Sequence, residues 1–172
     1  VWMLNQLLQE QFNPAAPHKS ERARGDVTFR EGDKVMQTRN DYDMTWSKDD
    51  GEIGRGVFNG DIGIIEKMDP IGRMMAIRFD DRVAEYPFDS ANELDHAYAV
   101  TVHKSQGSEF EAVILPLFEA NSRLYYRNLL YTAVTRAKKL LIIVGSARAV
   151  MTMVDNNRKS GRFTNLRFMM KE

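Results

Sequence analysis

Residues 112–117 (AVILPL) and residues 140–144 (LLIIV) decide the fold class of this chain. Both are continuous apolar runs of strand length, which is typical of strands that are buried on both faces of a parallel sheet. Residues 123–136 lie between them and carry apolar side chains at helical spacing, so a β–α–β crossover is the economical interpretation. Residues 147–157 favour a closing helix. We therefore predict an α/β fold for this part of the chain.

Upstream, the pattern is that of short antiparallel strands. Residues 61–68 (DIGIIEKM), 74–79 (MMAIRF) and 83–88 (VAEYPF) are β-like runs separated by tight turns. The pair Asn59-Gly60 and the sequence DPIG supply the left-handed and proline-set positions that such turns need. This spacing predicts a small SH3-like β-barrel, although a three-stranded meander with a packed helix would give the same pattern.

The first part of the chain is mixed in character. Residues 1–12 (VWMLNQLLQEQF) place leucines at helical spacing, and an Asn-Pro pair ends this predicted helix. Residues 14–30 are polar and punctuated by Pro and Gly, which favours a mobile loop. A strand is predicted over residues 34–38, and residues 40–56 are polar and Gly-rich, which favours a long surface excursion.

Charge is balanced overall but uneven along the chain. The 24 Lys and Arg residues match the 24 Asp and Glu residues. Residues 31–96 hold 16 acidic and 8 basic side chains, whereas residues 121–172 hold 2 acidic and 11 basic ones. The C-terminal part therefore attracts phosphate and the middle repels it. The alternative to a phosphate-binding role is that these basic residues only keep helical surfaces soluble.

Composition excludes several classes of site. The chain has no Cys, which removes disulfides, thiolate zinc sites and a cysteine nucleophile. Its 3 histidines, His18, His96 and His103, are scattered, so we expect no protein-built metal site. Because the sequence has neither an apolar run of about 18 residues nor a signal-peptide pattern, we expect a cytoplasmic protein without a membrane partner.

Residues 101–110 (TVHKSQGSEF) are the first candidate for chemistry. Loops beside the ends of parallel strands are where open α/β sheets place ligands. Gly107 would let the backbone approach a phosphate or ribose, and Lys104 supplies positive charge. Gln106 and Glu109 can hydrogen-bond water, Mg²⁺ ligands or sugar hydroxyls. An ordinary polar loop is the alternative.

Residues 128–138 (NLLYTAVTRAK) are the second candidate. Arg136 falls near the C-terminal end of the predicted helix, from where it could reach a neighbouring site. A guanidinium suits the charge that develops on a transferring γ-phosphoryl group, which is the arginine-finger role. The alternative is that Arg136, Lys138 and Lys139 only favour the helix dipole.

Together the two stretches carry a family resemblance. TVHKSQGSEF and RNLLYTAVTRAKKLLIIVG (residues 127–145) closely resemble motifs V and VI of superfamily 1 helicases, in the form found in RecD, TraA and related 5′-to-3′ enzymes. GDKVMQTRNDY (residues 32–42), VFNGDIG (residues 57–63) and LNQLLQEQFNP (residues 4–14) are also similar to that family. The resemblance covers nearly the whole chain.

The resemblance implies a fold and an activity. Residues 1–40 and 95–172 would form a RecA-like, P-loop NTPase-type parallel-sheet domain without the phosphate loop, and residues 41–94 an inserted SH3-like β-barrel. The whole enzyme would be an ATP-dependent DNA helicase of exodeoxyribonuclease V alpha-subunit type, moving 5′ to 3′. Residues 42–56 look longer than the usual connection into the barrel, and we assign them no function.

The resemblance also implies site residues. Arg136 would be the catalytic motif VI arginine that faces the γ-phosphate. The further groups near ATP would be Gln106, Gly107 and Glu109. Single-stranded DNA would face Thr101 and His103, with Lys104, Ser105, Arg39 and Asn40 as less secure candidates.

The sequence departs from the family pattern in one respect. It has no G-x-x-x-x-G-K-[ST] phosphate loop and no acidic pair after an apolar strand. ATP and Mg²⁺ of the full-length enzyme would therefore be held mainly by an N-terminal RecA-like domain of the same polypeptide. We expect no cofactor and no ATP hydrolysis in these residues alone, and no protein-bound metal. Further implied partners are single-stranded DNA and other exonuclease or repair subunits.

Two other functions remain open from the sequence. The chain could be a non-enzymatic interaction module, whose SH3-like barrel binds a partner protein on an α/β scaffold. It could also be the helicase part of a conjugative relaxase.

Overall fold

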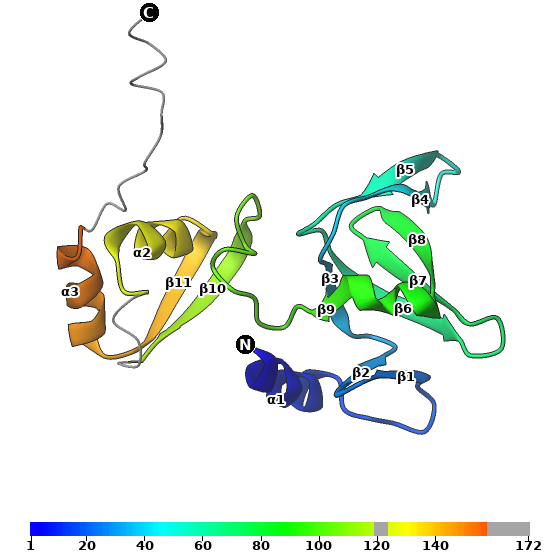
Figure 1. Ribbon diagram of the computed structural model, residues 1–172, viewed down its shortest axis with the longest axis horizontal. Helices are drawn as coiled ribbons and strands as arrows, with labels where there is room; N and C mark the ends of the chain where they lie inside the picture. Colours follow the sequence, from blue (N-terminus) through cyan, green and yellow to red (C-terminus); the bar gives the residue numbers. More distant parts are fainter. Residues whose placement is uncertain (119–123, 158–172) are drawn as a thin grey trace, which may run out of the picture. The chain divides into compact units, whose positions relative to one another are not determined.

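The computed structural model describes residues 1–118 and 124–157, which divide into two compact units. The first spans Val1–Gly107 and the second begins at Ser108. Figure 1 labels the elements of both units. The basic segment 158–172 lies outside the described residues, as does the start of the helix predicted over residues 123–136.

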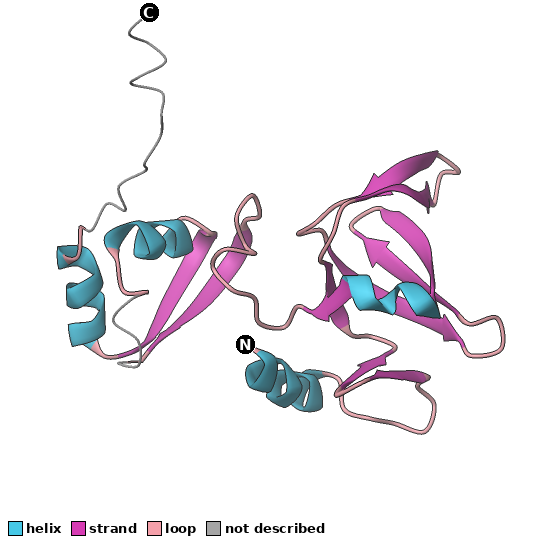
Figure 2. Ribbon diagram, viewed as in Figure 1, coloured by secondary structure: helices cyan, strands magenta, loops and turns pink. Residues whose placement is uncertain are grey.

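An antiparallel sheet of seven strands forms most of the first unit, as Figure 2 shows in magenta. Its spatial order is β5-β4-β8-β7-β6-β3-β9. The strands predicted over residues 34–38, 61–68, 74–79 and 83–88 are confirmed to within about a residue at each end. The seven strands are β3 (Lys34–Gln37), β4 (Asp41–Lys48), β5 (Ile53–Val57), β6 (Ile62–Asp69), β7 (Met74–Phe79), β8 (Arg82–Pro87) and β9 (Leu94–His96).

The sheet curls around a single apolar core. Every second residue of β7 is buried, as expected for a strand with one face inward. Val57 of the edge strand β5 and Val35 of β3, near the opposite edge, belong to the same core cluster. This closure confirms the SH3-like expectation in outline. A short 3-10 helix, η1 (Phe88–Glu93), joins β8 to β9 and buries Phe88 and Ala91 in that core.

Two segments expected to be irregular are hairpins instead. Residues 14–30 contain β1 (Glu21–Arg24) and β2 (Val27–Arg30), which pair with each other, and Phe29 is fully buried in the core. Residues 40–56 are mostly β4 and β5, and β4 also pairs with β8. Both expectations were wrong because a few inward apolar side chains and backbone pairing suffice to order strands rich in polar residues.

Helix α1 (Trp2–Phe12) is confirmed, but none of its leucines is fully buried. The buried side chains are Asn5 and Gln9, followed by Asn13 just after the helix. These polar residues recur every four positions and therefore lie on one helical face. Leu4 and Leu7 are exposed. The spacing of the leucines thus predicted the helix, whereas the buried face consists of the amide side chains of Asn5 and Gln9.

The second unit contains the predicted β–α–β crossover. Strands β10 (Phe110–Leu117) and β11 (Ala137–Gly145) pair in parallel, with α2 (Arg127–Val134) between them and α3 (Ala147–Asp155) after them. Leu117, Leu130, Ala149 and Met153 form its small core. The expected burial of both strand faces was wrong, because the described residues supply too few helices to cover a two-stranded sheet. Ile114, Leu140 and Ile142 are among its exposed side chains.

Candidate functional site

Arg136 is fixed between the end of α2 and the turn that precedes β10. Its Nε donates to Thr132 O at 3.1 Å, its Nη1 to Ser108 O at 2.9 Å and its Nη2 to Thr135 Oγ1 at 3.2 Å. The Arg136 carbonyl accepts a hydrogen bond of 2.8 Å from Phe110 N. An arginine carries five N–H donors, so the half-buried guanidinium keeps donor capacity for an anion. The predicted helix-end arginine and the turn before the strand therefore lie together.

The residues predicted to lie near ATP, Gln106, Gly107 and Glu109, differ in backbone conformation and in contacts. Gly107 has φ of 89°, a left-handed conformation that side chains rarely adopt. Gln106 is exposed. Glu109 is exposed too, and its carboxylate lies 3.5 Å from Lys138 Nζ. Salt screens such a surface pair strongly, so Glu109 remains available to another partner.

Residues 101–106 form a tight loop in the first unit. Ser105 N donates to Thr101 O at 3.0 Å, and Lys104 N donates to Thr101 Oγ1 at 3.2 Å. Thr101, His103 and Lys104 are exposed. Ser105 is buried, and its hydroxyl donates to Val102 O at 2.8 Å. Thr101, His103 and Lys104 thus present side chains to solvent, whereas Ser105 maintains the loop.

The weaker DNA candidates are connected to the same loop through a turn. Asn40 Oδ1 accepts a hydrogen bond of 2.9 Å from Asn59 N. A Cβ on the neighbouring Gly60 would lie 4.0 Å from Lys104 O. Arg39 is exposed and precedes Asn40. Lys104 is itself paired with Asp95 at 2.7 Å, which reduces the positive charge of this surface.

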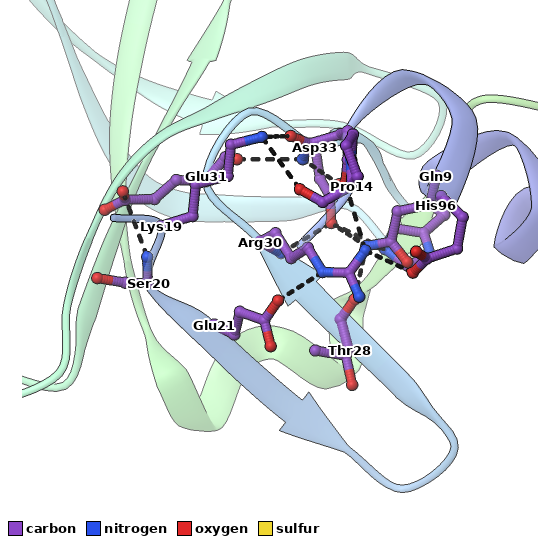
Figure 3. Close-up of polar contacts among 12 residues, drawn as sticks. Gln9, Pro14, Lys19, Ser20, Glu21, Thr28, Arg30, Glu31, Asp33 and His96 are labelled. Atoms are coloured by element: carbon purple, nitrogen blue, oxygen red, sulfur yellow. Dashed lines mark hydrogen bonds and ion pairs between the residues drawn. The ribbon is translucent and has the colours of Figure 1, made fainter. Parts of the chain in front are cut away.

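A buried polar cluster around Asp33, shown in Figure 3, was missed by the sequence reasoning. Asp33 has no exposed surface. Its Oδ1 accepts from Asn13 Nδ2 at 2.6 Å and from Tyr98 OH at 2.9 Å. Its Oδ2 accepts from Gln9 Nε2 at 2.6 Å and lies 3.1 Å from His96 Nε2. The available signal was the polar four-residue spacing within the first helix.

The cluster keeps Asp33 ionised. Burial raises the pKa of the Asp33 carboxyl, but hydrogen bonds from His96, Asn13, the Arg30 backbone and Tyr98 outweigh burial and hold that pKa below its usual value. Burial and the neighbouring carboxylate raise the pKa of Tyr98, so its hydroxyl remains a donor. Asp33 therefore acts as a charged acceptor for several chain segments.

The structure describes residues 1–118 and 124–157, and potential metal ligands are dispersed over these ranges. Within those ranges, no three His, Asp or Glu side chains are grouped as metal ligands would be. In the same ranges, no helix is long and apolar enough to cross a membrane.

Two family models match the chain in tandem. Residues 4–79 match the ATP-dependent RecD-like DNA helicase SH3 domain. Residues 96–144 match the UvrD-like helicase C-terminal domain. The first match contains Asp33 and strands β3 to β7 of the curled sheet, and the second contains the turn that holds Arg136. Both matches are to domains of DNA helicases.

Proteins with similar sequences indicate which kind of DNA helicase the chain resembles. The chain is 38% identical over 146 residues to the ATP-dependent RecD2 DNA helicase of Deinococcus radiodurans, covering 85% of this chain and 18% of that protein. It is 32% identical over 140 residues to the RecBCD enzyme subunit RecD of Mycobacterium tuberculosis, covering 81% of this chain and 22% of that one. The chain belongs to the RecD-like DNA helicases. It spans only about a fifth of these relatives' length.

A solved structure supports the fold alone. The crystal structure of Bacteroides Pif1 bound to ssDNA resembles this chain with a TM-score of 0.52 and 14% sequence identity. The match covers 88% of this chain and 42% of Pif1.

Proposed function

We propose that this chain is part of the second motor domain of an ATP-dependent DNA helicase that moves 5′ to 3′. In this proposal, residues 1–40 and 95–172 belong to the RecA-like domain and residues 41–94 to the inserted barrel. The observation that carries it is the placement of Arg136, whose guanidinium is held by Ser108 O at 2.9 Å and keeps unused donors. Such a group can bind a phosphoryl oxygen without first becoming ordered.

The residues present fit one end of a nucleotide and not the whole of it. ATP, when bound with Mg²⁺, supplies the γ-phosphoryl group whose transfer drives the motor. Arg136 would donate to that group, and the left-handed Gly107 would leave its backbone accessible. Gln106 and Glu109 would hydrogen-bond nearby water or sugar. Because the sequence lacks a phosphate loop, the remaining phosphate and Mg²⁺ contacts belong to an N-terminal RecA-like domain of the same polypeptide.

Single-stranded DNA is the second proposed ligand. Thr101, His103 and Lys104 are exposed on one loop, and the turn held by Asn40 lies beside it. Their hydroxyl, imidazole and ammonium groups suit phosphate and base contacts. We assign Ser105 to the shape of the loop because it is buried. Other exonuclease or repair subunits are candidate partners, as the name of the mycobacterial relative suggests.

The exposed apolar faces of β10 and β11 fit the proposed domain. A parallel sheet is stable when further strands and helices cover it. Ile114, Leu140 and Ile142 are exposed here, and the chain matches about a fifth of its relatives' length. We infer that other segments of the same polypeptide complete this sheet.

The test of the nucleotide role is Arg136→Ala in the full-length helicase. We expect DNA-stimulated ATP turnover to fall by about 10³-fold or more, with nucleotide affinity within a few-fold of wild type. Arg136→Lys should not restore turnover, because lysine lacks the planar fork. Arg148→Ala is the matched control, since Arg148 is exposed on α3. Normal turnover in Arg136→Ala would rule out the γ-phosphate role.

A further inference from the structure

The Asp33 carboxylate joins three stretches of chain that are far apart in sequence. Gln9 approaches it from α1, and the Arg30 backbone N donates to Oδ2 at 2.8 Å from the end of β2. His96 of β9 and Tyr98 just beyond it approach from the far end of the unit's sequence. In Figure 3 the side chains of Gln9 and His96 lie close together beside this cluster.

A second contact ties the same two ends together. Asn5 of α1 donates its Nδ2 to Ala99 O at 2.8 Å, and its Oδ1 accepts from Ala99 N at 2.8 Å. The side chain therefore pairs with both backbone groups of Ala99, as a neighbouring strand would. Two residues later, Thr101 begins the loop to which we assign DNA contacts.

We propose that Asp33 is a positioning residue, which fixes through His96 and Tyr98 the segment that enters the proposed DNA-binding loop of residues 101–106. This inference rests on the proposed function of that loop. In this proposal Asp33 contacts neither DNA nor nucleotide itself. It sets where the loop begins.

The cluster around Asp33 has few alternative arrangements. Five donors converge on two carboxylate oxygens of a fully buried side chain. Movement of residues 97–100 would leave a buried charge short of donors, which costs more than an ordinary hydrogen bond contributes. Tyr98 also stacks on Phe12 with ring centroids 6.5 Å apart. The loop entrance is therefore held in one position relative to α1.

The mildest test is Tyr98→Phe in the full-length helicase, which removes one donor and keeps the ring. Tyr86→Phe is the matched control, because its hydroxyl donates to Gln37 at 3.2 Å inside the same unit and not to the Asp33 cluster. The first measurement is hydrogen exchange at the amides of Ala99, Lys104 and Ser105, which are all hydrogen-bonded. We expect exchange there to rise about three- to tenfold in Tyr98→Phe and to stay unchanged in Tyr86→Phe.

The second measurement is the single-stranded DNA concentration that half-saturates ATP turnover. We expect it to rise about three- to tenfold in Tyr98→Phe, with the maximal turnover changed less than about twofold. Asp33→Asn should shift both measurements further in the same direction. A role confined to stability would affect Tyr98→Phe and Tyr86→Phe alike.

The outcomes are separable. Unchanged exchange at these three amides in both Tyr98→Phe and Asp33→Asn would overturn the positioning role. Faster exchange without any change in DNA dependence would support positioning by Asp33 and count against DNA binding by the loop. The proposed function is judged independently by Arg136→Ala.

Discussion

Asp33 is a fully buried carboxylate that hydrogen bonds keep charged. Desolvation alone would favour its neutral form. The donors of Gln9, Asn13 and Tyr98 replace the lost water, and none of them carries a net charge. The stability of the first unit therefore depends on one ionised group that is held mainly by uncharged hydrogen-bond donors.

This arrangement predicts how stability depends on pH. The folded-state pKa of Asp33 is lowered from 3.8, so its contribution is present above the unfolded pKa and is lost as pH falls through the folded pKa. Asp33→Asn should lower the free energy of unfolding by about 2–4 kcal/mol near neutrality. The difference from wild type should shrink below about pH 4.

Urea unfolding followed by tryptophan fluorescence measures this effect, since Trp2 and Trp46 both lie in the first unit. Asp89→Asn, at a highly exposed carboxylate, is the control and should change little. A constant difference between Asp33→Asn and wild type from neutrality down to pH 2 would contradict the proposed ionisation.

Among the elements, β6 depends on a glycine for packing and not for conformation. A Cβ at Gly63 would lie 2.7 Å from Arg78 O and 2.8 Å from Ile77 Cγ2 on the neighbouring strand β7. Gly51, in the turn between β4 and β5, is the reverse case. Its φ is 88° and its surroundings are open within 4 Å. Substitution of Gly63 therefore tests steric crowding, and substitution of Gly51 tests backbone strain.

We expect Gly63→Ala to lower the free energy of unfolding of the first unit by about 2–3 kcal/mol through overpacking. Gly51→Ala should cost about 1–2 kcal/mol through its left-handed backbone alone. Both are measured by urea unfolding with tryptophan fluorescence. If Gly63→Ala were within about 0.5 kcal/mol of wild type, β6 and β7 would not be as closely packed as described.

On the scale of the whole molecule, the two units differ in what they bury. The first contains the larger core, with Tyr86 and Phe79 almost completely enclosed. The second has a small core and many exposed apolar side chains on β10 and β11. The sheet of the first unit encloses its own core, whereas the sheet of the second unit is incompletely covered. This difference fits the proposal that the chain is part of a larger helicase.

We therefore expect residues 1–172 alone to show no ATP turnover, with or without single-stranded DNA, and we expect the full-length protein to turn over ATP. The reason is the missing phosphate loop. Phosphate release measured on both proteins at equal concentration tests this. Turnover by the 172-residue chain that disappears with Arg136→Ala would place the whole catalytic site within it and refute the shared-site proposal.

The sequence by itself determined the first helix, the four predicted strands of the sheet, the parallel crossover around α2 and the helicase family, because these depend on local periodicity, turn residues and two ordered motifs. It also pointed to Arg136 and to the turn before β10, which the fold brings together. Tertiary structure alone decided which face of α1 is buried, that the polar residues 14–30 and 40–56 form hairpins, and that Asp33 binds both ends of the first unit. Those outcomes depend on hydrogen bonds between residues up to 94 positions apart, which local patterns do not encode.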